Sequence, residues 1–260
     1  VMLPSDSDGG SGTDHLYEPG LWRVPSYLFA AGVGGLSVGL PVLTVGYWMT
    51  GVRLGGVAWT ELITALGNSV SASLPAALLA VVLAVPVAYV GVRYDSVWAK
   101  GFERIAYLGY ATPPMAFALA VIVFVLAVVP AAYQTLWVLV GAYALHFLAE
   151  AIGPIRSSLY QVPPSLEEAA RSLGSGTLGV FAKVLFPLLR RGMLVSLAFV
   201  FLSAMKELPL TLLLSPPGFR TLSTNAWSYA EEMMFARAAP FALAIILFSA
   251  CFVGLLLRRE

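Results

Sequence analysis

Long apolar runs alternate with shorter polar segments along most of the 260 residues. A helix needs about 20 mostly apolar residues to cross a bilayer, and six runs approach or reach that length. They are Leu28–Met49, Ser73–Val92, Pro114–Val129, Thr135–Ile152, Met193–Leu214 and Pro240–Leu257. The pattern therefore predicts an all-α membrane protein with six transmembrane helices.

The third and fourth runs are short and are separated by Pro130–Ala132. Together they are too long for one span, so we expect two spans with a break at the proline; a misassigned pair would leave four. Residues 1–22 are rich in Asp and Gly and predict a flexible tail or linker. This segment lacks the basic start of a signal peptide, so we expect the first span to be retained within a membrane domain covering residues 23–260.

Composition and charge support a membrane protein and suggest its orientation. Charged residues make up 11% of the chain, against about 25% in soluble domains. With the N-terminus inside, the outer segments hold only Arg53, Arg220 and Arg237, and 11 of the 15 basic residues lie inside. Because basic residues favour the cytoplasmic side, both termini are predicted to be cytoplasmic. The lipid bilayer is the expected environment, and a basic nucleic-acid binder is excluded.

Residues that could carry out catalysis are scarce. The chain has one cysteine, and its two histidines, His15 and His146, lie far apart in the sequence. It contains no Gly-rich phosphate-binding loop of the Walker type. We therefore expect no enzyme activity and no resident cofactor or metal, and any ATP hydrolysis must occur on another chain.

The polar segment Arg156–Arg191 contains two helix-like pieces. Ser165 is placed to cap the first piece, and Glu168 would complete a capping box. Glu167 and Glu168 suit the positive end of that helix, and Gly174 with Gly176 should end it. The second piece, Thr177–Phe186, runs to Pro187 and leads into the fifth span.

The spacing within this segment is specific. A Glu-Ala-Ala triplet is followed after three residues by glycine, and after nine more by an apolar residue, any residue, an apolar residue and proline. The residues concerned are Glu168, Ala169, Ala170, Gly174, Val184, Phe186 and Pro187. The pattern resembles the "EAA" loop of binding-protein-dependent ABC transporter permeases, with Val and Phe in place of Ile and Leu. The resemblance implies a coupling loop that docks on an ATPase subunit; a generic amphipathic connector is the alternative.

Three further segments, Met205–Leu214, Gly218–Leu222 and Phe235–Pro240, look like the C-terminal part of fused ferric-iron permeases. Gly20–Pro25 looks like the linker between the two halves of such proteins. The resemblance implies the type I (MetI-like) importer architecture in a prokaryotic plasma membrane. It also implies ABC ATPase subunits, an extracytoplasmic binding protein and ferric iron as cargo, with thiamine, a polyamine, sulfate or molybdate as alternatives.

Only one such half is present, and the chain starts at Val1. This fits a fragment, a split gene or a non-Met start codon. A single half cannot form the two-fold pathway that the resemblance implies. We therefore expect a second permease half, either another copy or a related chain.

Lys206 and Glu207 lie within the fifth apolar run. Insertion of a charged residue at the centre of a membrane helix costs about 2.5–3.5 kcal/mol, so these residues should face protein or water. Pro209 is expected to kink the helix beside them. Glu207 could line the translocation pathway or its gate and meet a hard cation; a structural ion pair is the alternative. Such charges could also couple ions in a secondary transporter, a different class of protein. A membrane-embedded enzyme is a third class.

Two weaker candidates complete the sequence analysis. His146 and Glu150 are four residues apart and would share a helix face, which suits a satisfied polar contact better than a metal or proton site. The outer segment Ser215–Ala239 could form a short helix over Asn225–Arg237. Its acidic pair, Glu231 and Glu232, could meet a binding protein, although a solvated helix face is the simpler expectation.

Overall fold

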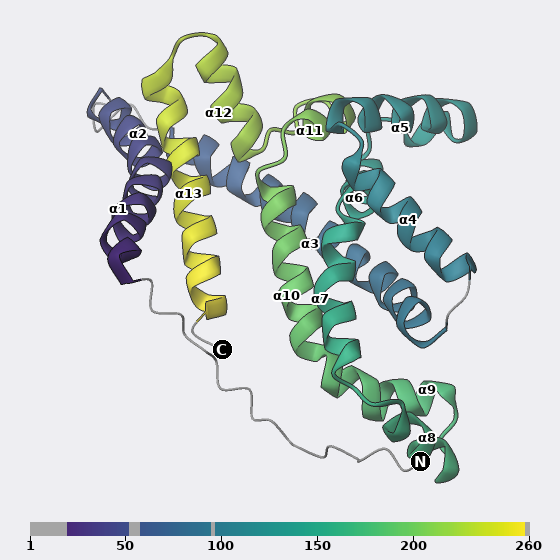
Figure 1. The fold of residues 1–260 in the computed structure, drawn as a ribbon. Coiled ribbons are helices and arrows are strands. Elements are labelled where there is room, and N and C mark those ends of the chain that lie inside the picture. The colour runs from purple at the N-terminus through teal and green to yellow at the C-terminus, as the bar shows by residue number, and fades with distance from the viewer. Residues whose placement is uncertain (1–19, 52–57, 95–96, 258–260) are drawn as a thin grey trace. The chain divides into compact units, whose positions relative to one another are not determined.

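The computed structural model describes residues 20–51, 58–94 and 97–257, and all regular structure in these ranges is helical (Figure 1). The helices are η1 (Gly20–Trp22), α1 (Arg23–Gly34), η2 (Gly35–Gly39), α2 (Leu40–Thr50), α3 (Trp59–Arg93), α4 (Val97–Ala111), α5 (Pro114–Val128), η3 (Pro130–Ala132), α6 (Leu136–His146), α7 (Leu148–Tyr160), α8 (Pro164–Ser172), α9 (Thr177–Val180), η4 (Phe181–Leu185), α10 (Phe186–Met205), α11 (Pro209–Leu214), α12 (Leu222–Glu231) and α13 (Phe235–Leu257).

The chain divides into a unit that ends at Tyr47 and a unit that begins at Trp48. In the first unit, α1 passes through the π-helical turn η2 into α2 without a break. The run from Arg23 to Thr50 has 28 residues and is apolar enough to cross a membrane. It contains the first predicted span.

The core of the second unit is formed where α3, α7 and α10 pack on one another, with α6 against α3. The buried face of α3 consists largely of small side chains at helical spacing. Its buried residues are Ala65, Ser69, Ala72, Ser73, Ala76, Ala77, Ala80, Val81, Ala84 and Ala88. In lipid, such a stripe allows helix backbones to approach closely, which explains why α3 is central to the packing.

The helices of the described residues allow four to six spans, a range that includes the predicted six, but two of these spans would be built from bent helix pairs. Four helices are long and apolar enough to cross a membrane, and two bent helix pairs bring the number to six if each pair is one span. One pair joins Gly101–Ala111 to Pro114–Val128 with a bend of 113°, and the other joins Leu136–His146 to Leu148–Tyr160 with a bend of 50°. The break at Pro130–Ala132 is confirmed as the 3-10 turn η3.

Two predicted span boundaries were wrong. The second helix begins at Trp59 rather than Ser73, because polar side chains in its first turns bond to other segments instead of ending the helix. α5 agrees with the predicted run Pro114–Val129 to one residue, but its 15 residues are only about 22 Å long, shorter than the hydrocarbon core of a bilayer. The fifth helix stops at Met205, and the short α11 packs against α5 and α6 instead of extending α10.

The outer segment forms a short helix, as expected, but earlier in the sequence. α12 covers Leu222–Glu231 because Thr221 caps it and Thr224 completes a reciprocal capping box. Met233 then takes a positive φ of 60°, and α13 begins at Phe235. The predicted range Asn225–Arg237 therefore spans the end of one helix and the start of the next.

Candidate functional site

The segment between α7 and α10 begins with a tight turn that ends in two prolines. Pro163 has an extended backbone (φ −67°, ψ 139°) and is the N-cap of α8, with Pro164 in the first turn. A residue before proline avoids the helical region, and proline suits the first helical position. Ser165 therefore lies inside the helix, and α8 has no side-chain cap. The predicted capping box of Ser165 and Glu168 was wrong because the proline pair sets the helix start.

The other end of α8 is closed by a Schellman motif. Gly174 has φ +83°, and its N–H donates to the Arg171 carbonyl at 2.9 Å. The Ser175 N–H donates to the Ala170 carbonyl at 3.0 Å. The prediction that Gly174 ends the helix is thus confirmed, because glycine adopts the left-handed conformation without a steric penalty. Gly176 has φ −69° and instead caps the start of α9.

Glu167 is the buried acidic residue of α8, with only 5% of its surface exposed. Its Oε1 accepts a hydrogen bond from Arg93 Nε at 2.7 Å, and its Oε2 accepts one from the Tyr89 hydroxyl at 2.7 Å. Arg93 Nη2 also donates to the Val162 carbonyl at 2.8 Å, in the turn before α8. The start of α8 is therefore bonded to the end of α3.

The opposite face of α8 is exposed. Ser165, Glu168 and Ala169 are exposed, and Ala170 is half-buried. Leu173, just after the helix, has 87% of its surface exposed, and Leu178 on α9 has 85% exposed. Side chains this apolar at the tip of a polar loop indicate a surface that another protein can cover.

Helix α9 continues into α10 through the π-helical turn η4. Pro187 is exposed in the first turn of α10, and Val184 is half-buried within η4. A proline in a helix displaces the carbonyl four residues earlier, and the wider π turn lies where that carbonyl belongs. The helical run therefore passes through Pro187 into the membrane segment. A cavity of about 260 Å³ separates η4 and α9 from Val85, Pro86 and Tyr89 of α3.

The predicted pathway residues lie at the break between α10 and α11. Lys206 ends α10 and is exposed, Glu207 is half-buried, and Pro209 begins α11. The Glu207 carbonyl accepts hydrogen bonds from the hydroxyls of Thr211 and Ser223, both at 2.8 Å. The expected kink is a complete break, and the freed carbonyl is satisfied by side chains.

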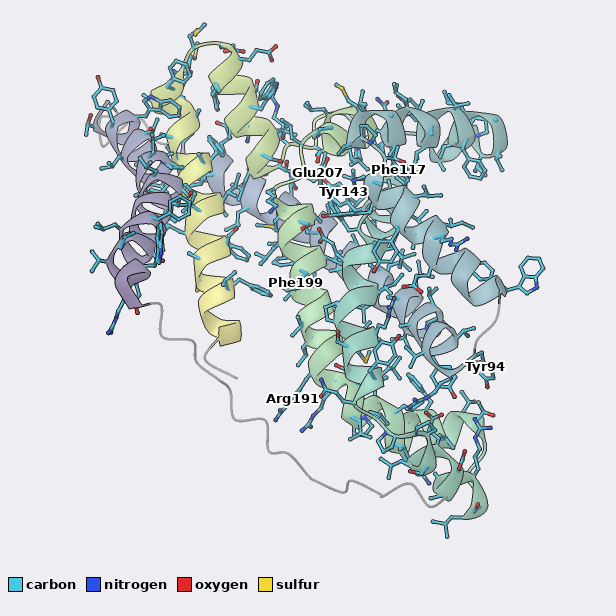
Figure 2. All side chains as sticks on the ribbon, viewed as in Figure 1. Tyr94, Phe117, Tyr143, Arg191, Phe199 and Glu207 are labelled. Atoms are coloured by element: carbon cyan, nitrogen blue, oxygen red, sulfur yellow. The ribbon has the colours of Figure 1, made fainter. Side chains whose placement is uncertain are left out.

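Buried hydroxyls extend this network into α6. Tyr143 bonds to Thr211, and Figure 2 shows Tyr143 close to Glu207. Because the Thr211 proton is donated to the Glu207 carbonyl, Tyr143 must be the donor to Thr211. The Glu207 side chain is less engaged: the hydrogen bond between its carboxylate and the described part of the chain is one from the Leu210 N–H to Oε1, at 3.3 Å. The carboxylate oxygens therefore have capacity to accept further hydrogen bonds or to bind a ligand.

His146 and Glu150 do not lie on one continuous helix, because Phe147 separates α6 from α7. His146 is buried with its ring 5.0 Å from Phe117 and 4.9 Å from Phe147. His146 Nδ1 and Glu150 Oε2 are buried without a hydrogen-bond partner in the described structure. Each side chain nevertheless has one polar partner, a backbone group of Gly109 for His146 and the Tyr110 hydroxyl for Glu150, so the expected satisfied contact is confirmed in part. No group of three metal-ligating side chains occurs among the described residues.

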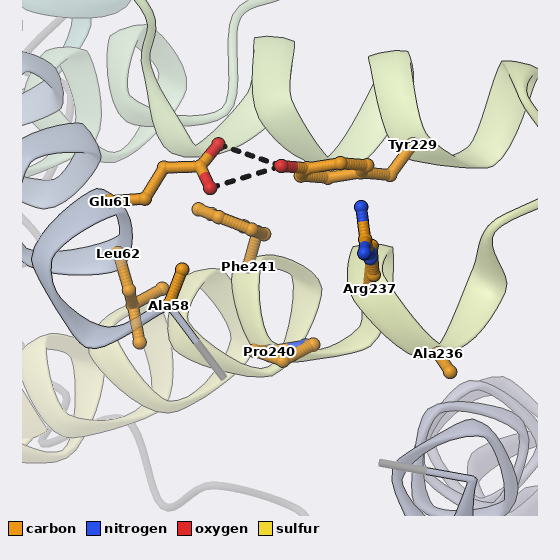
Figure 3. A pocket seen from close by; sticks show the side chains of 8 residues that line it. All are labelled: Ala58, Glu61, Leu62, Tyr229, Ala236, Arg237, Pro240 and Phe241. Atoms are coloured by element: carbon orange, nitrogen blue, oxygen red, sulfur yellow. Dashed lines mark hydrogen bonds between the residues drawn. The ribbon is translucent and has the colours of Figure 1, made fainter. Parts of the chain in front are cut away.

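A second polar site joins the start of α3 to α12 (Figure 3). The Tyr229 hydroxyl donates to both Glu61 oxygens, at 2.9 and 3.0 Å, beside a cavity of about 210 Å³. Burial, followed by the hydrogen bond to Glu61, raises the pKa of the Tyr229 hydroxyl. Glu231 and Glu232 are exposed. The sequence analysis did not identify Glu61, Tyr89 and Arg93 as members of these polar sites. The signal that could have found them is the presence of polar side chains within an otherwise apolar helix.

The helical fold and the segment between α7 and α10 that contains α8 and α9 are those of a multi-pass membrane transport subunit. Residues 76–258 match the family described as "Binding-protein-dependent transport system inner membrane component", and the chain belongs to that family. Family membership, together with the apolar helices, makes it a multi-pass permease of the inner membrane with a MetI-like fold.

Two relatives and one solved structure illustrate the similarity of the chain to known proteins. The chain is 35% identical, over 85% of its length, to an Fe(3+)-transport system permease protein of Haemophilus influenzae, but covers only 44% of that protein. It is 29% identical to a putative 2-aminoethylphosphonate transport system permease protein of Salmonella typhimurium, over 74% of this chain and 71% of the relative. An inward-facing structure of the MetNI methionine ABC transporter has the same fold, with a TM-score of 0.60 and 15% identity over 76% of this chain and 93% of that one.

Proposed function

We propose that the chain is the permease subunit of an ATP-driven importer and that α8 is its coupling helix. The observation that carries the proposal is the construction of α8. Buried Glu167 bonds one face of α8 to α3, the Schellman motif closes the C-terminal end of the helix, and Glu168 and Leu173 are exposed. A short helix fixed at both ends can transmit force from a bound motor without fraying.

The spacing of the Glu-Ala-Ala triplet and Gly174 supports an ABC ATPase subunit as the protein that binds the exposed face of α8. Glu168 and Ala169 are the residues of the motif that face outward, so they are the ones expected to touch the ATPase. The ATPase would lie in the cytoplasm. This agrees with the excess of basic residues in the inner segments, one of which contains α8. Both chain termini would then be cytoplasmic, and α12 would lie on the outer side.

The remaining partners follow from the family. An extracytoplasmic binding protein would deliver cargo to the outer side, and a second permease half, identical or related, would complete the pathway. The proposed cargo is ferric iron, supported by the 35% identity to an Fe(3+) permease. Glu207, with a carboxylate that accepts only one long hydrogen bond, offers the oxygen ligand that a hard cation prefers. Lys206 and Pro209 belong to the same proposed gate.

Cysteine crosslinking tests the docking. Cys251 is the only cysteine, so Cys251→Ser gives a background in which Ala169→Cys is the single reactive site. We expect Ala169→Cys to crosslink to a cysteine in the groove of the ATPase, whereas half-buried Ala170→Cys should react much less. Glu168→Arg should abolish ATP-dependent uptake. If transport continues and no crosslink forms, the proposal is wrong.

Uptake into proteoliposomes separates the alternatives. Import of iron that requires ATP, the binding protein and the ATPase supports the proposal. Import that persists without ATP hydrolysis would instead identify an ion-coupled secondary transporter. A requirement for ATP with a different cargo, such as a phosphonate, thiamine, a polyamine, sulfate or molybdate, would keep the permease and replace iron.

A further inference from the structure

Helix α3 bonds to other segments at both of its ends. At its C-terminal end, Arg93 and Tyr89 bond to Glu167 of α8. In its N-terminal third, Ser69 Oγ accepts a hydrogen bond from the Leu222 N–H at 2.9 Å, and Asn68 Nδ2 donates to the Arg220 carbonyl at 2.9 Å. Arg93 lies 25 residues after Asn68, which corresponds to about 37 Å of helix, more than the hydrocarbon core of a bilayer.

We propose that α3 is the rod that carries movement of α8 across the membrane to the segment preceding α12, and that Glu167 is the residue that positions α8 on this rod. The inference rests on the proposed function, because it assigns the route by which a docked ATPase acts on the far side. It goes further in placing the transmission on Glu167 and α3, not on the outward-facing Glu168.

The Glu167 carboxylate provides the direct hydrogen bonds between α8 and α3. α8 otherwise packs against α9 and η4. The cavity of about 260 Å³ lies between α3 and these elements, with Arg171 of α8 in its lining. A pull on α8 can therefore act directly on α3 through the Glu167 carboxylate. Removing one partner would leave a buried charge unpaired, so the bonds resist breaking.

The middle of α3 is suited to rigid movement. The helix is unbroken from Trp59 to Arg93, although it contains Pro75 and Pro86. Its alanine stripe packs directly on α7 and α10. The segment at its far end is tied to the pathway, since Ser223 donates to the carbonyl of Glu207. A shift of α3 would therefore act on the break between α10 and α11 through Ser69, Leu222 and Ser223.

The test uses the complete transporter in proteoliposomes, with its ATPase, second half and binding protein, and measures cargo imported per ATP hydrolysed. Glu167→Gln should leave the ATPase bound and hydrolysing but lower the cargo-to-ATP ratio by about tenfold or more, the loss expected for a charge-assisted buried bond. Tyr89→Phe removes one hydroxyl and should give a smaller loss in a chain that folds normally. The matched control for ATPase docking is Glu168→Gln, which should weaken ATPase binding instead.

Two further variants test the rod itself. Ser69→Ala lies far from α8, yet should lower the cargo-to-ATP ratio without altering ATPase binding. The reversed pair Glu167→Arg with Arg93→Glu should recover more transport than either reversal alone. A normal ratio in Glu167→Gln and Tyr89→Phe, or loss of ATPase binding in Glu167→Gln, would overturn the inference. If the wild-type transporter itself neither binds an ATPase nor needs ATP, the proposed function fails instead.

Discussion

Gly192 of α10 lies against Ser158 of α7 with no space for a side chain between them. A methyl group on Gly192 would lie 2.8 Å from the Pro154 carbonyl oxygen and closer still to the Ser158 hydroxyl. The contact joins two of the three helices that form the core. Close approach at a glycine is a common way for membrane helices to pack in lipid, where hydrophobic burial provides little drive.

Gly192→Ala is therefore expected to destabilise the chain by separating α7 from α10. Overpacking of a tight contact costs about 1–3 kcal/mol, which should lower the Tm of the purified protein in detergent. Gly153→Ala on α7 is the matched control, because a methyl group there meets no atom within 4 Å. Equal Tm values for the two variants would contradict the proposed close packing.

Gly174 requires a left-handed conformation (φ +83°), which an alanine adopts at a cost of about 1–2 kcal/mol. Gly174→Ala should therefore loosen the C-terminal end of α8, increase amide exchange at positions 174 and 175, and reduce binding of the ATPase. Gly176→Ala should have little effect, since Gly176 has φ −69° and an added methyl group meets nothing within 4 Å. Hydrogen exchange read by mass spectrometry compares the two, and equal protection in both would show that the motif does not hold the helix.

Helix capping should have different effects in α12, which has a side-chain cap, and in α8, which has none. Thr221 caps α12, and replacement of such a cap by alanine costs about 1 kcal/mol. Thr221→Ala should therefore increase amide exchange in the first turn of α12, where the Thr224 N–H loses its acceptor. Ser165→Ala should leave exchange in α8 unchanged, because Ser165 caps nothing. Increased exchange in α8 of Ser165→Ala would restore the capping box that the sequence suggested.

The sequence pattern could predict what depends on neighbouring residues. Apolar runs located the helices, and the spacing from Glu168 to Pro187 located the loop, because each feature lies within one continuous segment of the sequence. Glu167 could not be recognised, since its burial depends on Arg93 and Tyr89, which lie 74 and 78 residues earlier. Likewise, the polar start of α3 lies outside the predicted span Ser73–Val92, because its hydrogen-bond partners, Arg220 and Leu222, are more than 150 residues away in the sequence.

The same reasoning explains the errors at individual boundaries. Ser165 matches the residue preference of a cap, but the preceding proline pair already fixes where the backbone turns helical. Pro209 indicated a kink, whereas the extent of the break depends on Thr211 and Ser223, which satisfy the freed carbonyl. At Ser165 one local preference therefore overrides another, whereas the form of the break at Pro209 depends on hydrogen bonds to the Glu207 carbonyl.

Glu207 gives the sharpest prediction about the pathway, because its structural bonds and its carboxylate can be separated. Two hydroxyls bond to its backbone carbonyl, and these bonds do not depend on the side chain. Glu207→Gln also keeps an oxygen that can accept from the Leu210 N–H. The variant should therefore assemble normally and keep its Tm, while uptake of a ferric cargo falls by about tenfold or more from loss of the charged ligand.

Glu232→Gln, the same change at an exposed site, should transport normally. Normal uptake by a normally assembled Glu207→Gln variant would remove this carboxylate from the pathway.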